Sequence, residues 1–173
     1  MGAISGWKDK VLFTPGPLTT SRTVKQAMLR DLGSRDFDFI ETVKDMRRRL
    51  LEIGQVSSPE YEAIPVQGSG TFSIEAVFAS TVRPEGHVLI VINGAYGRRM
   101  AKICATLGIR HTTLECVENR PPDTEAIEKA LSGEGTFTDV AVVHCETTTG
   151  IVNPIQHIGE LVKAGAPVTS STP

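Results

Sequence analysis

Cysteine and aromatic residues are scarce in this sequence. Its 173 residues include three cysteines, and phenylalanine, tyrosine and tryptophan together make up 5%. The odd number and wide spacing of Cys104, Cys116 and Cys145 argue against a disulfide framework and against a cysteine-based metal site. We therefore expect reduced thiols, with Cys145 serving as a small buried hydrophobic residue.

Long apolar runs and a strong charge of either sign are also missing. No stretch approaches the ~18 consecutive apolar residues of a membrane-spanning helix, and the N-terminus lacks the apolar run of a secretory signal. The formal net charge of -2 provides no bulk attraction to nucleic acid or to an anionic membrane. We expect an intracellular protein, cytoplasmic rather than mitochondrial, that binds neither nucleic acid nor membrane and holds any anion in a local site.

The histidines suggest neither a metal site nor a hydrolase. They lack ligand spacing to one another and to the cysteines, so no metal is expected; they are His87, His111, His144 and His157. A Ser-His-Asp hydrolase of the α/β type would need a G-x-S-x-G turn, which the sequence does not contain.

What the sequence does contain is an alternation of short β-branched runs with helical patterns. Strands are expected at 63–67, 88–92, 111–115 and 140–144, and helices at 72–82, 97–107, 124–131 and 155–163. This order is typical of βαβ units, and the almost wholly apolar run from Val88 to Ile92 suits a strand covered on both faces. The predicted fold class is α/β, a mostly parallel sheet with flanking helices.

Two helices are expected before this alternation. Ser21 can cap the first, which would end near Gly33. The second would run from about Asp36 to Ile53. Its arginine run at 47–49 is interpreted as solvated cations near a helix C-terminus, in preference to a nucleic-acid patch.

The end of the pattern suggests an incomplete domain. After the last expected helix another buried strand should follow, but the sequence supplies Val168 to Pro173 and stops. A sheet that ended there would keep an unpaired edge, which small domains usually avoid. We therefore divide the chain into an N-terminal arm with the first helix, residues 1–33, and a partial large domain, residues 34–173.

One loop after an expected strand is suited to an anion. In open α/β sheets, ligands bind beyond the carboxyl ends of the strands. The segment 68–71, Gly-Ser-Gly-Thr, combines glycines with a helix start, whose free N–H groups and positive dipole end attract anions. Ser69 and Thr71 add hydroxyl donors. The segment matches neither the Walker A nor the dinucleotide pattern, and a helix cap with nothing bound is the alternative.

Two further loops are expected at the same edge of the sheet. Tyr96, within the segment 93–97, could lie flat against a planar ligand, or could pack onto its own sheet. The segment 146–150, Glu-Thr-Thr-Thr-Gly, offers hydroxyls to a ring substituent, or could satisfy loop backbone groups. Each loop alone is a weak signal, and three at one edge are a stronger one.

These loops and the N-terminal turn carry a resemblance to a known family. The segments 13–22, 66–77, 93–97 and 144–150 resemble 2-aminoethylphosphonate–pyruvate transaminases, a branch of the class V aminotransferases of fold type I. The resemblance runs from about Val11 to Lys163. It implies that the chain is the front part of the large domain of a pyridoxal-phosphate-dependent transferase.

The resemblance implies a role for each matching loop residue. Ser69, Gly70 and Thr71 would hold the phosphate group of pyridoxal 5′-phosphate. Tyr96 would lie over the pyridine ring of that cofactor, and Thr147 would form a hydrogen bond with the ring hydroxyl.

The resemblance also implies substrates and an assembly. Gly16 and Ser21 would lie against the substrate. The reaction of the family converts 2-aminoethylphosphonate and pyruvate into phosphonoacetaldehyde and L-alanine, so the ligands would be an amine or phosphonate and a 2-oxo acid. The full-length family implies a homodimer.

Two catalytic parts of the family are expected beyond this sequence. The aspartate that pairs with the pyridinium nitrogen would fall at about Ser171, where the tail no longer resembles the family. The lysine that carries the cofactor would follow it, together with a C-terminal domain. We therefore expect a truncated chain without turnover of its own.

Three other interpretations remain open at this point. The chain could be a fragment of an alanine–glyoxylate transaminase, the nearest relative of this branch. It could be a non-catalytic module that pairs with a full-length subunit. It could also be a generic domain that binds nucleotide phosphates, in which case ATP would compete with pyridoxal phosphate.

Overall fold

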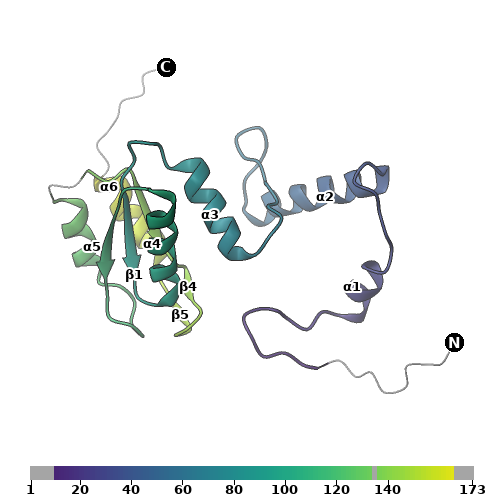
Figure 1. The fold of residues 1–173 in the computed structure, drawn as a ribbon, viewed down its shortest axis with the longest axis horizontal. Helices are drawn as coiled ribbons and strands as arrows, with labels where there is room; N and C mark the ends of the chain where they lie inside the picture. The colour runs from purple at the N-terminus through teal and green to yellow at the C-terminus, as the bar shows by residue number, and fades with distance from the viewer. Residues whose placement is uncertain (1–9, 134–135, 166–173) are drawn as a thin grey trace. The chain divides into compact units, whose positions relative to one another are not determined.

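The chain forms two compact units, Met1–Pro65 and Val66–Pro173. The computed structural model describes residues 10–133 and 136–165, and Figure 1 shows their helices and strands. Within this described part, every buried residue belongs to the second unit. The division predicted at residue 33 stays a prediction.

The described part of the first unit, residues 10–65, contains two helices. Ser21 caps α1 (Arg22–Ala27), with its hydroxyl accepting from the Val24 amide at 3.3 Å, as predicted. The helix ends well before Gly33. Short helices are marginal without tertiary packing, and Leu29, just beyond α1, is 83% exposed. The second helix, α2 (Phe37–Ile53), matches the prediction within one residue.

The arginine run on α2 is paired with acidic neighbours. Arg48 binds Asp45 and Glu52 along the helix, and Arg49 binds Asp45 at 2.7 Å. The hydrogen bond from Arg48 holds the pKa of the Asp45 carboxyl below its ordinary value. Such exposed pairs contribute little to stability, and their geometry agrees with a solvated helix face.

The second unit is built on a parallel sheet. Its central strand β1 (Val88–Ile92) pairs in parallel with β2 (His111–Glu115) and β3 (Asp139–Val142), in the order β2-β1-β3. The first two strands have the predicted bounds, and the third begins one residue earlier and ends two earlier than expected. The predicted α/β fold class with a parallel sheet is confirmed.

Helices cover both faces of β1. On one face, Ile90 packs with Phe78 of α3 (Gly70–Thr81) and Met100 of α4 (Ala95–Leu107). On the other, Val91 packs with Ile127 of α5 (Thr124–Leu131) and Ile158 of α6 (Ile155–Gly165). Successive strand residues face opposite sides, which explains why a strand between two helix layers is apolar throughout. Each such side chain contributes roughly 1.5–3 kcal/mol when fully buried.

The strand predicted at 63–67 is wrong. The structure leaves this segment without secondary structure, and Ile64 is 78% exposed. A strand requires hydrogen bonds to a neighbouring strand, and none of the described strands pairs with the segment. Pro65 also lacks an amide donor. The further strand anticipated from Val168 lies outside the described residues.

The expectation that Cys145 is buried is also wrong. Cys145 and Glu146 form β4, which pairs in an antiparallel ribbon with β5 (Ile151–Val152). Glu146 is fully buried, so its strand neighbour Cys145 points to the exposed side. Cys104, by contrast, is buried in the core, and burial raises the pKa of its thiol.

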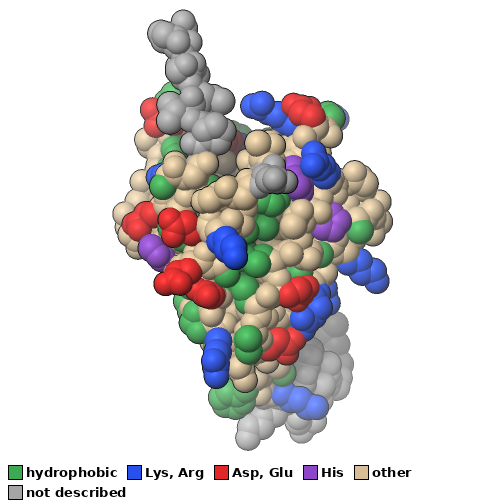
Figure 2. Space-filling model, turned by 90° about the vertical axis from the view of Figure 1, so that its left-hand side faces the viewer, with side chains coloured by type: hydrophobic (Ala, Val, Ile, Leu, Met, Phe, Trp, Pro, Cys, Tyr) green, Lys and Arg blue, Asp and Glu red, His purple; other side chains and the backbone are tan. Residues whose placement is uncertain are grey.

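Neither a membrane-spanning helix nor a metal-binding cluster occurs among the described residues. No described helix has the length and apolarity needed to cross a bilayer. No group of three or more histidine, cysteine and acidic residues in the described ranges could hold a metal ion. Figure 2 shows the face on which α5 lies, where basic side chains are scattered among acidic ones.

Candidate functional site

The candidate site lies at the carboxyl edge of the sheet in the second unit. Asn93 follows β1 directly and leads into α4, and Glu146 lies just after β3. The start of α3 is joined to this edge through a side chain of α4, Arg99. The three loops singled out in the sequence are thus brought together by the fold.

The start of α3 presents free hydrogen-bond donors. Ser69 caps the helix, with its hydroxyl accepting from the Phe72 amide at 3.3 Å. Among the described residues, no group accepts from the amides of Gly70 or Thr71. A Cβ at Gly70 would meet nothing within 4 Å, so the surface beside this helix start is open. Helix starts of this kind bind anions.

Gly68 gives this helix start its shape. Its φ of +151° lies outside the range that other residues adopt readily, and a Cβ there would lie 2.7 Å from Cδ1 of Phe72. Only glycine permits this close turn. The backbone therefore enters α3 with the Ser69 side chain at the cap and the next two amides exposed.

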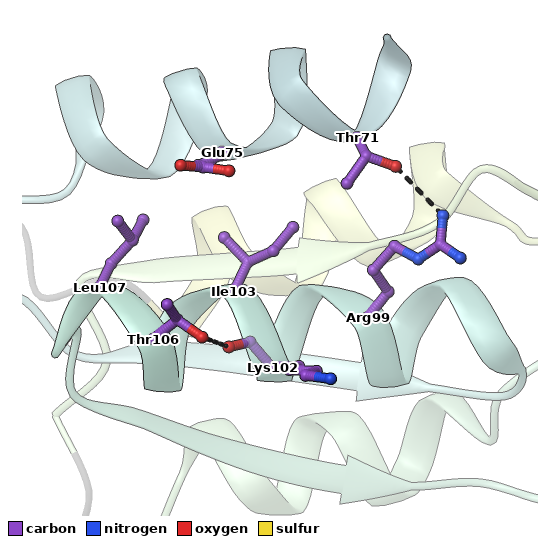
Figure 3. Close-up of a pocket in the computed structure, with 7 residues that line it drawn as sticks. All are labelled: Thr71, Glu75, Arg99, Lys102, Ile103, Thr106 and Leu107. Atoms are coloured by element: carbon purple, nitrogen blue, oxygen red, sulfur yellow. Dashed lines mark hydrogen bonds between the residues drawn. The ribbon is translucent and has the colours of Figure 1, made fainter.

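Arg99 links the first loop to the second. Its Nη1 donates to Oγ1 of Thr71 at 3.1 Å, as Figure 3 shows, and its Cζ lies over the ring of Tyr96, 5.0 Å from the centroid. The same two helices enclose a groove of about 240 Å³. In Figure 3, Arg99 reaches from α4 to the first turn of α3, while Ile103 lies between the two helices farther along.

Glu146 links the second loop to the third. Its buried carboxylate accepts from the Tyr96 amide at 3.2 Å and from the Thr148 hydroxyl at 2.7 Å. The amide belongs to the first turn of α4, where a negative charge is favoured by the helix dipole. A Cβ at Gly94 would lie 2.4 Å from Cδ of Glu146, so glycine is needed for this approach.

A pair of buried asparagines fixes the same edge. Nδ2 of Asn93 donates to Oδ1 of Asn153 at 2.8 Å, and Nδ2 of Asn153 donates to Oδ1 of Asn93 at 3.1 Å. Asn153 also donates to the Val143 carbonyl at 2.7 Å, and Asn93 to the Arg120 carbonyl at 3.0 Å. Buried side-chain amides whose donors and acceptors are all hydrogen-bonded in this way make a site rigid.

Thr147 lies half-buried in a tight turn. The amides of Thr149 and Gly150 both donate to the Glu146 carbonyl, at 3.2 and 2.7 Å, and Gly150 has a φ of +73°. No described residue forms a hydrogen bond with the Thr147 side chain. Its hydroxyl is therefore available to a ligand.

Gly16 and Ser21 belong to the first unit. Gly16 lies in a turn that Thr14 closes by donating its hydroxyl to the Pro17 carbonyl at 2.7 Å. The Ser21 hydroxyl acts as the α1 cap. Their contact with a substrate stays a prediction.

The sequence interpretation missed the residues that connect the loops. Arg99 stands three positions after Tyr96 in a helix, and that spacing places both on one face, so this signal was readable. Glu146 was noted only as a residue that could satisfy loop backbone groups. The pairing of Asn93 with Asn153 joins positions 60 residues apart and has no local signal.

The site combines free amides and hydroxyls at the start of α3 with the ring of Tyr96 and the unused hydroxyl of Thr147. This combination suits a ligand that has a phosphate group and a planar ring. Solved structures with the same fold are aminotransferases. An alanine–glyoxylate aminotransferase from Nostoc matches with a TM-score of 0.81 and 28% identity, covering 95% of this chain and 43% of that chain. A ureidoglycine–glyoxylate aminotransferase from Bacillus subtilis matches with a TM-score of 0.79 and 32% identity, covering 88% and 39%. The fold is that of an aminotransferase α/β domain.

The family follows from the sequence comparison. The model of the family described as aminotransferase class-V matches residues 19–169, and the chain belongs to that family. A 2-aminoethylphosphonate–pyruvate transaminase of Burkholderia lata is 49% identical over 152 residues, which cover 88% of this chain and 40% of that protein. One of Rhizobium meliloti is 46% identical over 154 residues, covering 89% and 40%. The chain thus spans about 40% of the length of these relatives, and the predicted resemblance is confirmed.

Proposed function

We propose that this chain supplies the cofactor-phosphate-binding part of a pyridoxal-phosphate-dependent aminotransferase that uses 2-aminoethylphosphonate and pyruvate. The observation that carries the proposal is the convergence of the α3 start, Tyr96 and the Thr147 turn at one edge of the sheet, held by Arg99 and Glu146. A phosphorylated planar ring matches this combination of free donors and aromatic surface.

Each residue has a role in this proposal. The amides of Gly70 and Thr71 and the hydroxyls of Ser69 and Thr71 bind the phosphate group. Tyr96 lies against the pyridine ring, and Thr147 donates to the ring hydroxyl. When bound, pyridoxal phosphate acts as an electron sink that lets an amino group pass from donor to acceptor.

The choice of substrates rests on the relatives. The relatives at 44–49% identity carry the name 2-aminoethylphosphonate–pyruvate transaminase. The alanine–glyoxylate aminotransferase of Nostoc has 28% identity, so the alanine–glyoxylate alternative has weaker support. The proposal extends to a homodimeric whole protein in the cytoplasm, as the family resemblance implies. Sedimentation velocity of the whole protein would test the dimer.

The cofactor site is tested by binding of pyridoxine 5′-phosphate. This probe has the phosphate and the ring but no aldehyde, so it cannot form an imine with surface lysines. In equilibrium dialysis we expect the chain to bind it, and to bind unphosphorylated pyridoxine and ATP more weakly. Thr71→Val removes one hydroxyl donor and should reduce affinity about fivefold. Failure of the unmodified chain to bind the probe contradicts the proposal.

A matched variant separates the site from general effects. Thr106 lines the same groove, but among the described residues its hydroxyl bonds only the Lys102 carbonyl of its own helix. Thr106→Val should therefore leave the affinity for the probe unchanged. Equal losses for Thr71→Val and Thr106→Val would show that the α3 start is not the phosphate site.

Turnover is tested separately with the 173-residue chain. None of the lysines in the described ranges lies on a loop that follows β1 or β3, where the candidate site is. We expect no alanine from 2-aminoethylphosphonate, pyruvate and pyridoxal phosphate in a coupled assay. Sustained alanine formation by the purified chain would show that a lysine of this chain serves the reaction.

A further inference from the structure

Arg99 contacts both halves of the candidate cofactor site without belonging to either loop. Its guanidinium donates to the Thr71 hydroxyl at 3.1 Å and lies over the Tyr96 ring. Glu75 lies one turn farther along α3 and lines the same groove, and a carboxylate would be the stronger partner for a guanidinium. In Figure 3 the guanidinium nevertheless meets Thr71.

The bond to Arg99 determines what the Thr71 hydroxyl can do. Arginine has only donors, whereas a hydroxyl has one donor and two acceptor lone pairs. Thr71 therefore accepts from Arg99, and its own O–H remains available as a donor. An anion at the start of α3 receives that donor, and the neighbouring cation strengthens it.

The contact with Tyr96 determines which face of the ring is available. A cation is attracted to the electron-rich face of an aromatic ring. Because Arg99 covers one face of Tyr96, a planar ligand can stack only on the other. One guanidinium thus orients the phosphate-binding hydroxyl and the stacking ring together.

We propose that Arg99 is a positioning residue for the cofactor, which directs the Thr71 hydroxyl toward the phosphate and supports the Tyr96 ring from behind. This inference rests on the proposed function, since it assigns a task at the same site. It concerns binding of the phosphorylated ring, and no step of the amino transfer is attributed to Arg99.

The test measures affinity for pyridoxine 5′-phosphate in the full chain. Arg99→Gln should weaken binding about tenfold, through loss of the oriented hydroxyl and of the ring support. Arg98→Gln is the matched control. It removes the same charge from the neighbouring position, but Arg98 pairs with Glu115 and Glu118, so it should change affinity less than about twofold. Arg99→Lys should recover part of the loss because an ammonium can donate to Thr71.

A second measurement separates positioning from simple charge attraction. In a Thr71→Val background, Arg99→Gln should cost markedly less affinity than in the unmodified chain, because the hydroxyl that Arg99 orients is gone. The same cost in both backgrounds would show that Arg99 does not act through the Thr71 hydroxyl and would overturn the inference.

The outcomes distinguish this inference from the proposed function. If the unmodified chain binds no probe, the cofactor site itself is wrong and the inference falls with it. If the chain binds and Arg99→Gln behaves like Arg98→Gln, only the role of Arg99 is overturned. Because the Arg99 side chain is exposed, the variant should keep its unfolding midpoint, which checks that the fold is intact.

Discussion

At the scale of single residues, two of the buried polar side chains of the second unit, Glu146 and His87, have contrasting surroundings. Glu146 is fully buried, and its carboxylate accepts hydrogen bonds from Tyr96 and Thr148. His87 is 7% exposed; its Nε2 meets the Thr112 hydroxyl at 2.9 Å, while no described group pairs with Nδ1. A buried polar atom without a partner costs free energy, so His87 is a local weakness of the fold.

His87 should make the stability of the chain depend on pH. Burial lowers the pKa of His87 below its ordinary value of 6.5, and the charges of Arg110 and His111 lower it further. Below pH 6.5 the unfolded chain binds a proton at His87, whereas the folded chain keeps this histidine neutral until the pH reaches its lowered pKa. The free energy of unfolding is therefore not reduced by His87 above pH 6.5, and it decreases as the pH falls from 6.5 toward the lowered pKa of the folded state.

Urea unfolding at a series of pH values between 7.5 and 5 would measure this effect. His87→Gln keeps a side chain that can bond Thr112 but cannot titrate, so its free energy of unfolding should fall less steeply with decreasing pH. Identical slopes for the variant and the unmodified chain would show that His87 does not couple folding to pH.

At the scale of elements, the start of α4 depends on a close approach between two loops. The amide of Tyr96 and the carboxylate of Glu146 meet only because Gly94 has no side chain. The approach brings the loop after β1 against the turn after β3, and with it Tyr96 toward Thr147. Packing at this single contact therefore shapes the candidate site.

Gly94→Ala should destabilise the chain by about 1–3 kcal/mol, because its Cβ would overlap a buried side chain. The clash is with Glu146, at 2.4 Å. Gly159→Ala on α6 is the matched control, since a Cβ there meets nothing within 4 Å. That change should be neutral or stabilising by roughly 0.5–1 kcal/mol through helix propensity. Chemical denaturation measures the free energy of unfolding of both variants. Equal values would contradict the close contact between Gly94 and Glu146.

At the scale of the whole molecule, the burial is unevenly distributed between the two units. All buried residues of the described part belong to Val66–Pro173, whereas large apolar side chains of the first unit such as Phe13 and Ile53 are 92% and 79% exposed. A segment with few buried contacts opens at low free-energy cost. The two units should therefore differ in local stability.

Limited proteolysis with trypsin would show this difference. We expect the first cuts between residues 10 and 49, for example at Lys44, and a resistant fragment that begins at Leu50, because no lysine or arginine lies between Arg49 and Arg83. Arg99 and Lys102 provide the internal control because they are exposed on α4, a helix anchored by the buried Met100 and Cys104. Early cleavage at Arg99 or Lys102 would contradict the expected order.

The sequence by itself determined the elements whose patterns are local. The apolar run of β1, the α5 bounds and the Ser21 cap were all readable, because periodicity and caps depend on neighbours in the chain. The family motifs also placed Tyr96 and Thr147 after two of the strands, and the parallel pairing of β1 with β3 explains why these two segments lie at one edge of the sheet.

Only the tertiary structure decided which side chains connect those loops. The contacts of Arg99 with Thr71 and of Glu146 with Tyr96 join positions 28 and 50 residues apart, and the sequence does not specify such pairs locally. The exposed Cys145 and the missing strand at 63–67 have the same physical reason. Burial and strand pairing depend on what the rest of the fold places beside a segment.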